Sequence, residues 1–312
     1  MENLYDLIIL GGGPASMSAS IYAKQMGLKT LLIEKAAFGG QVATTSTITN
    51  YLGFPVITGA ELSQKMKDHT ASSGTEIVEA EITNTELKST LKTVYTHNQK
   101  YTAKAVIIGI GTTARALGID NEKQYLNKGI SYSTIRDRDK YVDKVVTVVG
   151  GGNSAIEDAI YLSEKCKTVQ LIHRRQEFRG DSQLVDQLYK LVNEGKIELH
   201  LDCKPHSVSG QDKVEKFNIT HIPTGDIQSL DTDCIFVAIG RGADTDIIDK
   251  NIERDPQGYI VTNELMQTNL PGVFAAGDIR TTPFRQIVTA VADGAVASLS
   301  AFKYIKELST KN

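Results

Sequence analysis

The sequence has few cysteines, and none of them lies near another. Its 312 residues include only three, Cys166, Cys203 and Cys234, and these form no CxxC pair. Such spacing is not typical of a metal-binding cluster or of the disulfide framework of a small secreted protein, so we predict no metal site. We expect buried thiols that pack as small hydrophobic side chains, with a distant pair meeting in space as the alternative.

Long apolar runs and a strong charge of either sign are also missing. No stretch approaches the roughly 18 apolar residues of a membrane-spanning helix, and the acidic N-terminus leads directly into a strand, unlike a signal peptide. The net charge of −3 indicates no polyanionic partner. We therefore expect a cytoplasmic protein, of about two domains from its length, that binds neither nucleic acid nor membranes.

Residues 6–34 have the pattern of a strand, a glycine turn, a helix and a second strand. The apolar run Leu7–Leu10 enters the triplet Gly11–Gly13, where glycines let the backbone turn tightly and approach a pyrophosphate at the helix N-terminus. Glu34 ends the second strand, where a carboxylate can accept hydrogen bonds from a ribose diol. The unit predicts a dinucleotide site, although Ser16 replaces the third glycine and is expected to loosen the helix-strand packing slightly.

A second copy of this unit follows later in the chain. A run of valines ending at Val149 enters Gly150–Gly152, a helix follows, and His173 stands at the interval from Gly150 that separates Glu34 from Gly11. The repeat predicts an α/β fold with two Rossmann-like dinucleotide-binding domains.

The two copies differ at the end of their second strand. Where the first has an acid, the second has His173 followed by Arg174, Arg175 and Arg179. Guanidinium groups suit a 2′-phosphate through forked, charge-assisted hydrogen bonds, so the second ligand is predicted to be NADPH. The alternatives are arginines that merely solvate a turn, and a further flavin, against which Arg174 and Arg175 argue.

Other segments are positioned to serve the first site. Gly40, Gln41 and the small polar residues up to Asn50 can wrap a heterocycle, or form an ordinary solvated loop. Near the C-terminus, an apolar strand ends at Gly277-Asp278, which can bond a sugar-like hydroxyl. A helix is expected from Arg285, and its N-terminus would stabilise negative charge on a ring. We also expect strands over Glu76–Ile82 and Glu198–Cys203.

Two similar strand ends suggest how the units are connected. Ile110-Gly111 resembles Ile239-Gly240, and the chain is predicted to cross between units near Thr113–Arg115 and near Gly242–Asp244. Residues 115–244 would then form a domain inserted into a discontinuous domain of residues 1–114 and 245–312.

Several motifs together resemble the low-molecular-weight thioredoxin reductases, of the pyridine nucleotide-disulfide oxidoreductase type, over nearly the whole chain. They are GGGPAS, GGQ with the later Asn50, GGGNSA, HRRQEFR, FVAIGR and AAGDIRTTPFRQIVTAVADGA. The resemblance implies FAD in the discontinuous domain, NADPH in the inserted domain, a homodimer, and rotation of one domain against the other.

The resemblance also implies the residues at each cofactor. For FAD these are Gly11, Gly13, Pro14, Ala15, Glu34, Gly40, Gln41, Asn50, Gly277, Asp278, Arg285, Gln286 and Ile287. For NADPH they are Gly150, Gly152, Asn153, Ser154, His173, Arg174, Arg175 and Arg179.

One departure from the family pattern concerns the redox centre. Where the family has Ser-Tyr-Cys-x-x-Cys-Asp, residues 131–137 read Ser-Tyr-Ser-Thr-Ile-Arg-Asp, so Ser133 and Arg136 occupy the cysteine positions. Neither side chain has disulfide chemistry, and electrons cannot leave the flavin through an internal dithiol. Arg136 and Asp137 are the catalytic candidates. Arg136 is expected to approach the flavin and stabilise its reduced anion, or alternatively to point into solvent.

We predict an FAD flavoenzyme that takes hydride from NADPH and passes electrons directly to an external acceptor, since FAD performs the hydride chemistry. Candidate acceptors are ferredoxin, flavodoxin, a small disulfide, a quinone and oxygen. A ferredoxin- or flavodoxin-NADP reductase is one alternative. Ferredoxin-NADP reductases of the thioredoxin-reductase type carry an aromatic tail over the flavin. The absence of such a tail after the last helix, which is expected to end near Lys306, argues against this alternative. A redox-inactive FAD/NADPH-binding sensor or interaction protein is the other.

Overall fold

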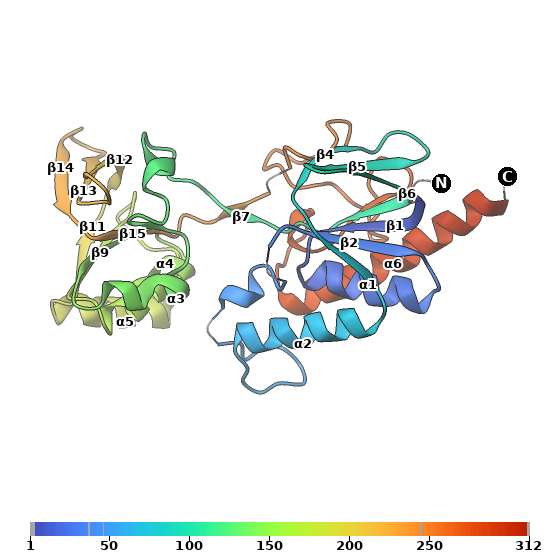
Figure 1. The fold of residues 1–312 in the computed structure, drawn as a ribbon. Helices are drawn as coiled ribbons and strands as arrows, with labels where there is room; N and C mark the ends of the chain where they lie inside the picture. Colours follow the sequence, from blue (N-terminus) through green and yellow to red (C-terminus); the bar gives the residue numbers. More distant parts are fainter. Residues whose placement is uncertain (1–3, 37, 46, 244, 311–312) are drawn as a thin grey trace. The chain divides into compact units, whose positions relative to one another are not determined.

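The computed structural model describes residues 4–36, 38–45, 47–243 and 245–310, and it divides into two units (Figure 1). The first unit combines residues 1–113 with 242–312, and the second comprises residues 114–241. The short strands β7 (Thr113–Ala114) and β16 (Arg241–Gly242), on the two connecting segments, pair with each other. Asp244, the predicted end of the second crossing, lies outside the described residues.

The first unit is built on a seven-stranded sheet in which β3, β2, β1, β6, β5 and β4 are successive neighbours and β17 also pairs with β6. Strand β6 has two neighbours on one side because its first half pairs antiparallel with β5 and its last residues pair parallel with β17. The strands are β1 (Leu4–Leu10), β2 (Thr30–Glu34), β3 (Glu76–Glu79), β4 (Ile82–Glu86), β5 (Lys92–Thr96), β6 (Lys100–Ile108) and β17 (Val273–Ala275).

The central strands of this sheet are apolar on both faces. Ile8 and Leu10 of β1 belong to one hydrophobic cluster, and Leu7 and Ile9 belong to a second cluster on the opposite face. This alternation is expected for parallel strands covered on both sides. The helices of the unit are α1 (Pro14–Gln25), α2 (Gly59–Ser72) and α6 (Ile287–Thr310), with short 3-10 turns η1 (Val42–Thr44) and η4 (Gly277–Ile279).

Helices α1 and α6 pack at very close range through small residues. A Cβ atom on Gly294 would lie 2.1 Å from the Ala15 carbonyl oxygen, so only glycine fits there. Ser18 donates a hydrogen bond to the Val291 carbonyl at 2.7 Å, and Ser298 donates to that of Ala19 at 2.5 Å. The C-terminal helix thus fixes α1, whose N-terminus follows the first glycine turn.

Ser16, at the position of the third motif glycine, does not loosen this packing. Its side chain is fully buried, and its hydroxyl lies 3.2 Å from both the Leu10 and the Gly109 carbonyl oxygens. A Cβ on Gly109 would lie 2.2 Å from that hydroxyl, so a glycine on the neighbouring segment makes room for the serine. The expectation of looser packing was therefore wrong.

The second unit contains a five-stranded parallel sheet in the order β11-β10-β9-β15-β8 and a three-stranded antiparallel sheet β12-β13-β14. Each face of the parallel sheet has its own hydrophobic cluster. Its elements are β8 (Ile130–Ser131), α3 (Thr134–Asp137), β9 (Val145–Val149), α4 (Asn153–Ser163), β10 (Thr168–Ile172), α5 (Ser182–Asn193), β11 (Ile197–His200), β12 (Cys203–Ser209), β13 (Lys216–His221), β14 (Ile227–Asp231) and β15 (Cys234–Val237), with 3-10 turns η2 (Glu122–Tyr125) and η3 (Arg138–Tyr141).

Several predicted boundaries were wrong. The expected strand Glu76–Ile82 is two strands, because β3 pairs parallel with β2 while β4 pairs antiparallel with β5. The expected strand Glu198–Cys203 ends at His200, and β12 begins at Cys203. The last helix begins at Ile287, two residues after Arg285, and runs to Thr310. No described helix is long and apolar enough to cross a membrane.

Candidate nucleotide-binding sites

The two glycine turns have the same internal geometry. A Cβ on Gly11 would lie 2.6 Å from the Gly109 carbonyl oxygen, and one on Gly150 would lie 2.3 Å from that of Ala238. Both glycines also have positive φ angles, of 99° and 153°. The first glycine of each turn is therefore required by close approach to the neighbouring strand end and by its backbone conformation.

The third glycine of each turn faces open space instead. A Cβ on Gly13 or Gly152 would meet no atom within 4 Å. Neither α1 nor α4, which start directly after these glycines, has a side chain that caps its N-terminus by a hydrogen bond. Uncapped backbone N–H groups beside open space fit a pyrophosphate at both places.

The second glycine of each turn lies against the side chain that distinguishes the two copies. A Cβ on Gly12 would lie 2.8 Å from the Glu34 side chain, and one on Gly151 would lie 2.0 Å from the His173 ring. The Glu34 carboxylate accepts hydrogen bonds from the backbone N–H groups of Gly12 at 2.5 Å and Ala36 at 2.9 Å. Glu34 and His173 thus occupy the same place in the two units.

Polar side chains from distant parts of the sequence meet near the first turn. Gln41 donates from Nε2 to Asp278 Oδ2 at 3.1 Å and to Thr112 Oγ1 at 2.9 Å. Asn50 donates to Gln286 Oε1 at 3.1 Å. The structure therefore joins the polar segment after β2 to the C-terminal segment, as a cofactor enclosed by both would require.

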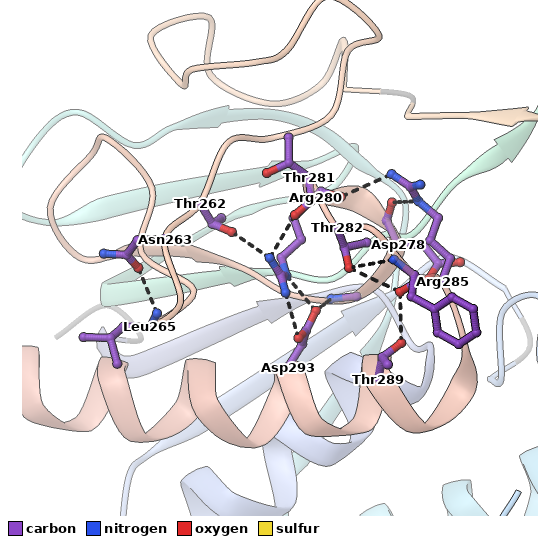
Figure 2. A network of polar contacts seen from close by, with 12 residues as sticks. Thr262, Asn263, Leu265, Asp278, Arg280, Thr281, Thr282, Arg285, Thr289 and Asp293 are labelled. Atoms are coloured by element: carbon purple, nitrogen blue, oxygen red, sulfur yellow. Dashed lines mark hydrogen bonds and ion pairs between the residues drawn. The ribbon is translucent and has the colours of Figure 1, made fainter.

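The turn that carries Asp278 is held by a largely buried ion pair between Arg280, which follows the turn, and Asp293 of α6 (Figure 2). Arg280 donates from Nε to Asp293 Oδ2 at 2.7 Å and from Nη2 to Oδ1 at 3.1 Å, and the backbone N–H of Gly277 donates to the same carboxylate at 3.0 Å. Both side chains are largely buried, at 15% and 11% exposure. A little further along the chain, the Arg285 guanidinium lies 4.0 Å from the centre of the Tyr259 ring.

The second unit contains a cavity of about 590 Å³ beside its glycine turn. The predicted NADPH residues all line it. Its polar and glycine lining comprises Arg115, Gly150, Gly151, Gly152, Asn153, Ser154, His173, Arg174, Arg175, Arg179, Lys204 and Gly240. The sequence interpretation missed Arg115 and Lys204, since both lie outside the repeated motif and reach the cavity only through the fold.

The three arginines of this cavity are available for an anion. None of Arg174, Arg175 and Arg179 forms an ion pair with a carboxylate among the described residues, whereas Arg136, Arg138 and Arg280 elsewhere do. His173 is buried, and its pKa is lowered by burial and by the nearby Arg174 and Arg179. The ring is therefore neutral near pH 7, and the positive charge of the cavity comes from guanidinium and ammonium groups.

Asp137 is a buried carboxylate that accepts hydrogen bonds from three nearby side chains. Arg136 donates from Nη2 at 2.7 Å, Lys140 from Nζ at 2.8 Å and Ser131 from Oγ at 2.7 Å. Burial by itself raises the pKa of Asp137, but these donors outweigh burial and hold it well below its usual range. Arg136 is paired with this carboxylate, and Ser133 caps α3 by accepting from the Arg136 backbone N–H at 3.4 Å.

The three cysteines are free thiols. Burial raises the pKa of Cys166 to about 11 and that of Cys234 to about 12, and it also raises the pKa of Cys203. Each is therefore protonated near neutral pH, which makes it a poor nucleophile.

Comparison with known proteins agrees with this geometry. A model of the pyridine nucleotide-disulphide oxidoreductase family matches residues 5–294. The chain is 38% identical over 298 residues to the thioredoxin reductase of Mycoplasma genitalium, covering 95% of this chain and 94% of the relative. It is also 38% identical over 305 residues to a 34.2 kDa protein in the rubredoxin operon of Clostridium pasteurianum, covering 97% and 98%. The structure of Lactococcus lactis thioredoxin reductase is similar with a TM-score of 0.87 at 34% identity, covering 97% of this chain and 99% of that one.

Two dinucleotide folds in one chain, with a basic cavity in the second, define an oxidoreductase that works with a pyridine nucleotide and a flavin. The chain belongs to the pyridine nucleotide-disulphide oxidoreductase family and is a thioredoxin-reductase-like enzyme dependent on FAD and NADPH.

Proposed function

We propose that this enzyme oxidises NADPH and passes the electrons from its flavin directly to an external acceptor, without an internal redox disulfide. The observation that carries the proposal is the state of the thiols. The three cysteines are free, with pKa values raised by burial, and Ser133 and Arg136 stand where the family pattern has cysteines. No pair of thiols in this chain can therefore accept electrons from the flavin and hand them on.

In this proposal the first unit holds FAD and the second holds NADPH. The open space at Gly13, the uncapped start of α1 and the group of Gln41 and Asp278 support the first assignment. Arg174, Arg175 and Arg179, which line the cavity and form no ion pair among the described residues, support the second, since they can neutralise a 2′-phosphate. When bound, FAD supplies hydride acceptance and release of electrons, while the chain orients both nucleotides and stabilises their charges.

We further propose that the acceptor is a small redox protein and that the enzyme is a homodimer. A relative encoded in a rubredoxin operon supports the first point, because it links a chain of this type to a one-electron carrier. Thioredoxin, which is reduced by dithiol exchange, is a poor candidate for a chain without a reactive cysteine pair.

An anaerobic turnover screen with NADPH tests the proposal. We expect electron transfer to ferredoxin, flavodoxin or rubredoxin and none to thioredoxin. Alkylating the NADPH-reduced enzyme with iodoacetamide should leave turnover unchanged, because no thiol takes part. Thioredoxin reduction that alkylation abolishes would contradict the proposal. A flavin that NADPH does not reduce would instead indicate a redox-inactive sensor.

Arg136 is proposed to stabilise the reduced flavin anion, with Asp137 holding its guanidinium in place. Arg136→Ala should then make the midpoint potential of the bound flavin more negative, because a positive charge near the anion is lost. The matched control is Lys140→Ala, which removes another cation from Asp137 and keeps Arg136. Spectroelectrochemistry of both variants measures the effect, and an unchanged potential in Arg136→Ala would exclude the role.

A further inference from the structure

Arg174, Arg175 and Arg179 lie on a loop, residues 174–181, that is attached directly to the glycine turn and to the first residue of α4. The backbone N–H of Arg179 donates to the Gly151 carbonyl at 3.2 Å. Gly180 lies so close to α4 that a Cβ there would be 2.5 Å from Ile156 Cδ1 and 3.1 Å from Asn153 Oδ1. We call this segment the arginine loop.

Asn153 and Asp181 form a reciprocal pair that closes this loop. Asn153 donates from Nδ2 to Asp181 Oδ2 at 2.8 Å, and the backbone N–H of Asp181 donates to Asn153 Oδ1 at 2.9 Å. Both ends of the Asn153 amide are therefore engaged with the loop. The amide is used to hold protein to protein, although Asn153 stands where the motif predicts a ligand contact.

His173, directly before the loop, contacts residues 177 and 178 within it. Its ring stacks on Phe178 with a centroid distance of 5.1 Å and an interplanar angle of 17°. His173 Nε2 lies 3.1 Å from the Glu177 carbonyl oxygen, and because a carbonyl only accepts, the neutral ring carries its proton on Nε2. Residues 177–181 of the loop are thus held by Asn153, Gly151 and His173, while its arginines have no carboxylate partner among the described residues.

We propose that the Asn153–Asp181 pair is a positioning device that fixes the arginine loop in the conformation needed to bind a 2′-phosphate, and so helps to select NADPH over NADH. The proposal rests on the assignment of NADPH to this cavity. Holding several like-charged guanidinium groups together without a counterion opposes their mutual repulsion, so the loop must be closed by other contacts before the phosphate arrives. Affinity then depends on the fraction of protein in which the loop is closed.

The direction in which one substitution changes the affinity for a phosphate distinguishes this role from simple electrostatics. Removing the Asp181 carboxylate makes the cavity more positive, which by charge alone would strengthen binding of a phosphate. If the pair positions the loop, Asp181→Ala instead weakens binding. Asn153→Ala removes the same pair without changing the charge, and should weaken binding to a similar degree.

The experiment is isothermal titration of the FAD-loaded enzyme with adenosine 2′,5′-bisphosphate and with adenosine 5′-monophosphate. We expect Asp181→Ala and Asn153→Ala each to weaken binding of the 2′,5′-bisphosphate by about five- to twentyfold, as a loop closed in only a fraction of molecules would. The double variant should be no weaker than either single variant, because both remove one interaction. Binding of the monophosphate should change by less than about twofold, since it makes no use of the loop.

Asp186→Ala is the control, because it removes an exposed carboxylate from α5 in the same unit. It should leave both affinities unchanged. Unchanged or tighter binding of the 2′,5′-bisphosphate by Asp181→Ala would overturn the positioning role. A wild-type enzyme that binds the two nucleotides equally would overturn the NADPH assignment itself, and the positioning role with it.

Discussion

At the residue scale, Asp158 shows how burial changes the chemistry of one side chain. It lies on α4 and accepts a hydrogen bond from Thr134 Oγ1 at 2.5 Å, which ties α4 to α3. Burial raises its pKa to about 6, although the Thr134 bond opposes this. Asp137, on α3, has a pKa shifted in the opposite direction by its donors. The number of donors each carboxylate receives decides the difference.

The raised pKa of Asp158 predicts a pH dependence of stability. Because the folded state favours the protonated acid, its contribution is full below pH 4 and is lost as the pH rises through about 6. Asp158→Asn should therefore raise the free energy of unfolding at pH 8 by at most about 3 kcal/mol, and by little at pH 4. Urea denaturation at the two pH values measures this. Equal effects at both would show that Asp158 is not protonated in the folded protein.

At the scale of elements, the turn η4 connects β17 to the segment before α6, and the Arg280–Asp293 pair fixes it to that helix (Figure 2). The Thr262 hydroxyl and the Thr281 carbonyl accept further bonds from Arg280 Nη1, at 3.2 and 2.9 Å. The buried pair is therefore satisfied on both sides, and it determines where Gly277 and Asp278 lie.

Breaking this pair should loosen the turn and the cofactor together. Asp293→Asn leaves the largely buried Arg280 charge without its carboxylate partner. It should therefore lower the free energy of unfolding by about 3 kcal/mol and reduce FAD retention. Replacing both residues, as Arg280→Met with Asp293→Leu, should recover part of the stability but not the lost bond to Gly277. Flavin content after gel filtration and thermal unfolding are the measurements. Glu307→Gln, on an exposed part of α6, is the control, and an effect of equal size there would contradict the argument.

At the scale of the whole molecule, each unit has its own sheet and its own hydrophobic clusters. The cavity that we assign to NADPH is lined only by residues of the second unit. The paired connecting strands β7 and β16 bring the two ends of that unit together, which is the arrangement expected when one domain is inserted into another.

Local sequence determined the parts of this protein that rest on backbone chemistry and on charge. Glycine is required at positions where a Cβ would clash or where φ is positive, so the two glycine turns were predictable from their motifs. The arginines after His173 and the absence of a CxxC motif could also be read from the sequence. The family and the class of enzyme follow from these features.

Only the tertiary structure decided which distant residues meet. Gln41 and Asp278 are 237 positions apart, and Lys204 reaches the second site from a segment with no motif of its own. It also decided where the expected strand Glu76–Ile82 breaks, because β3 pairs with β2 at one end of the sheet order whereas β4 pairs with β5 at the other end. The physical reason is that such contacts depend on how elements pack, and packing energy is a property of the assembled core rather than of any short stretch of chain.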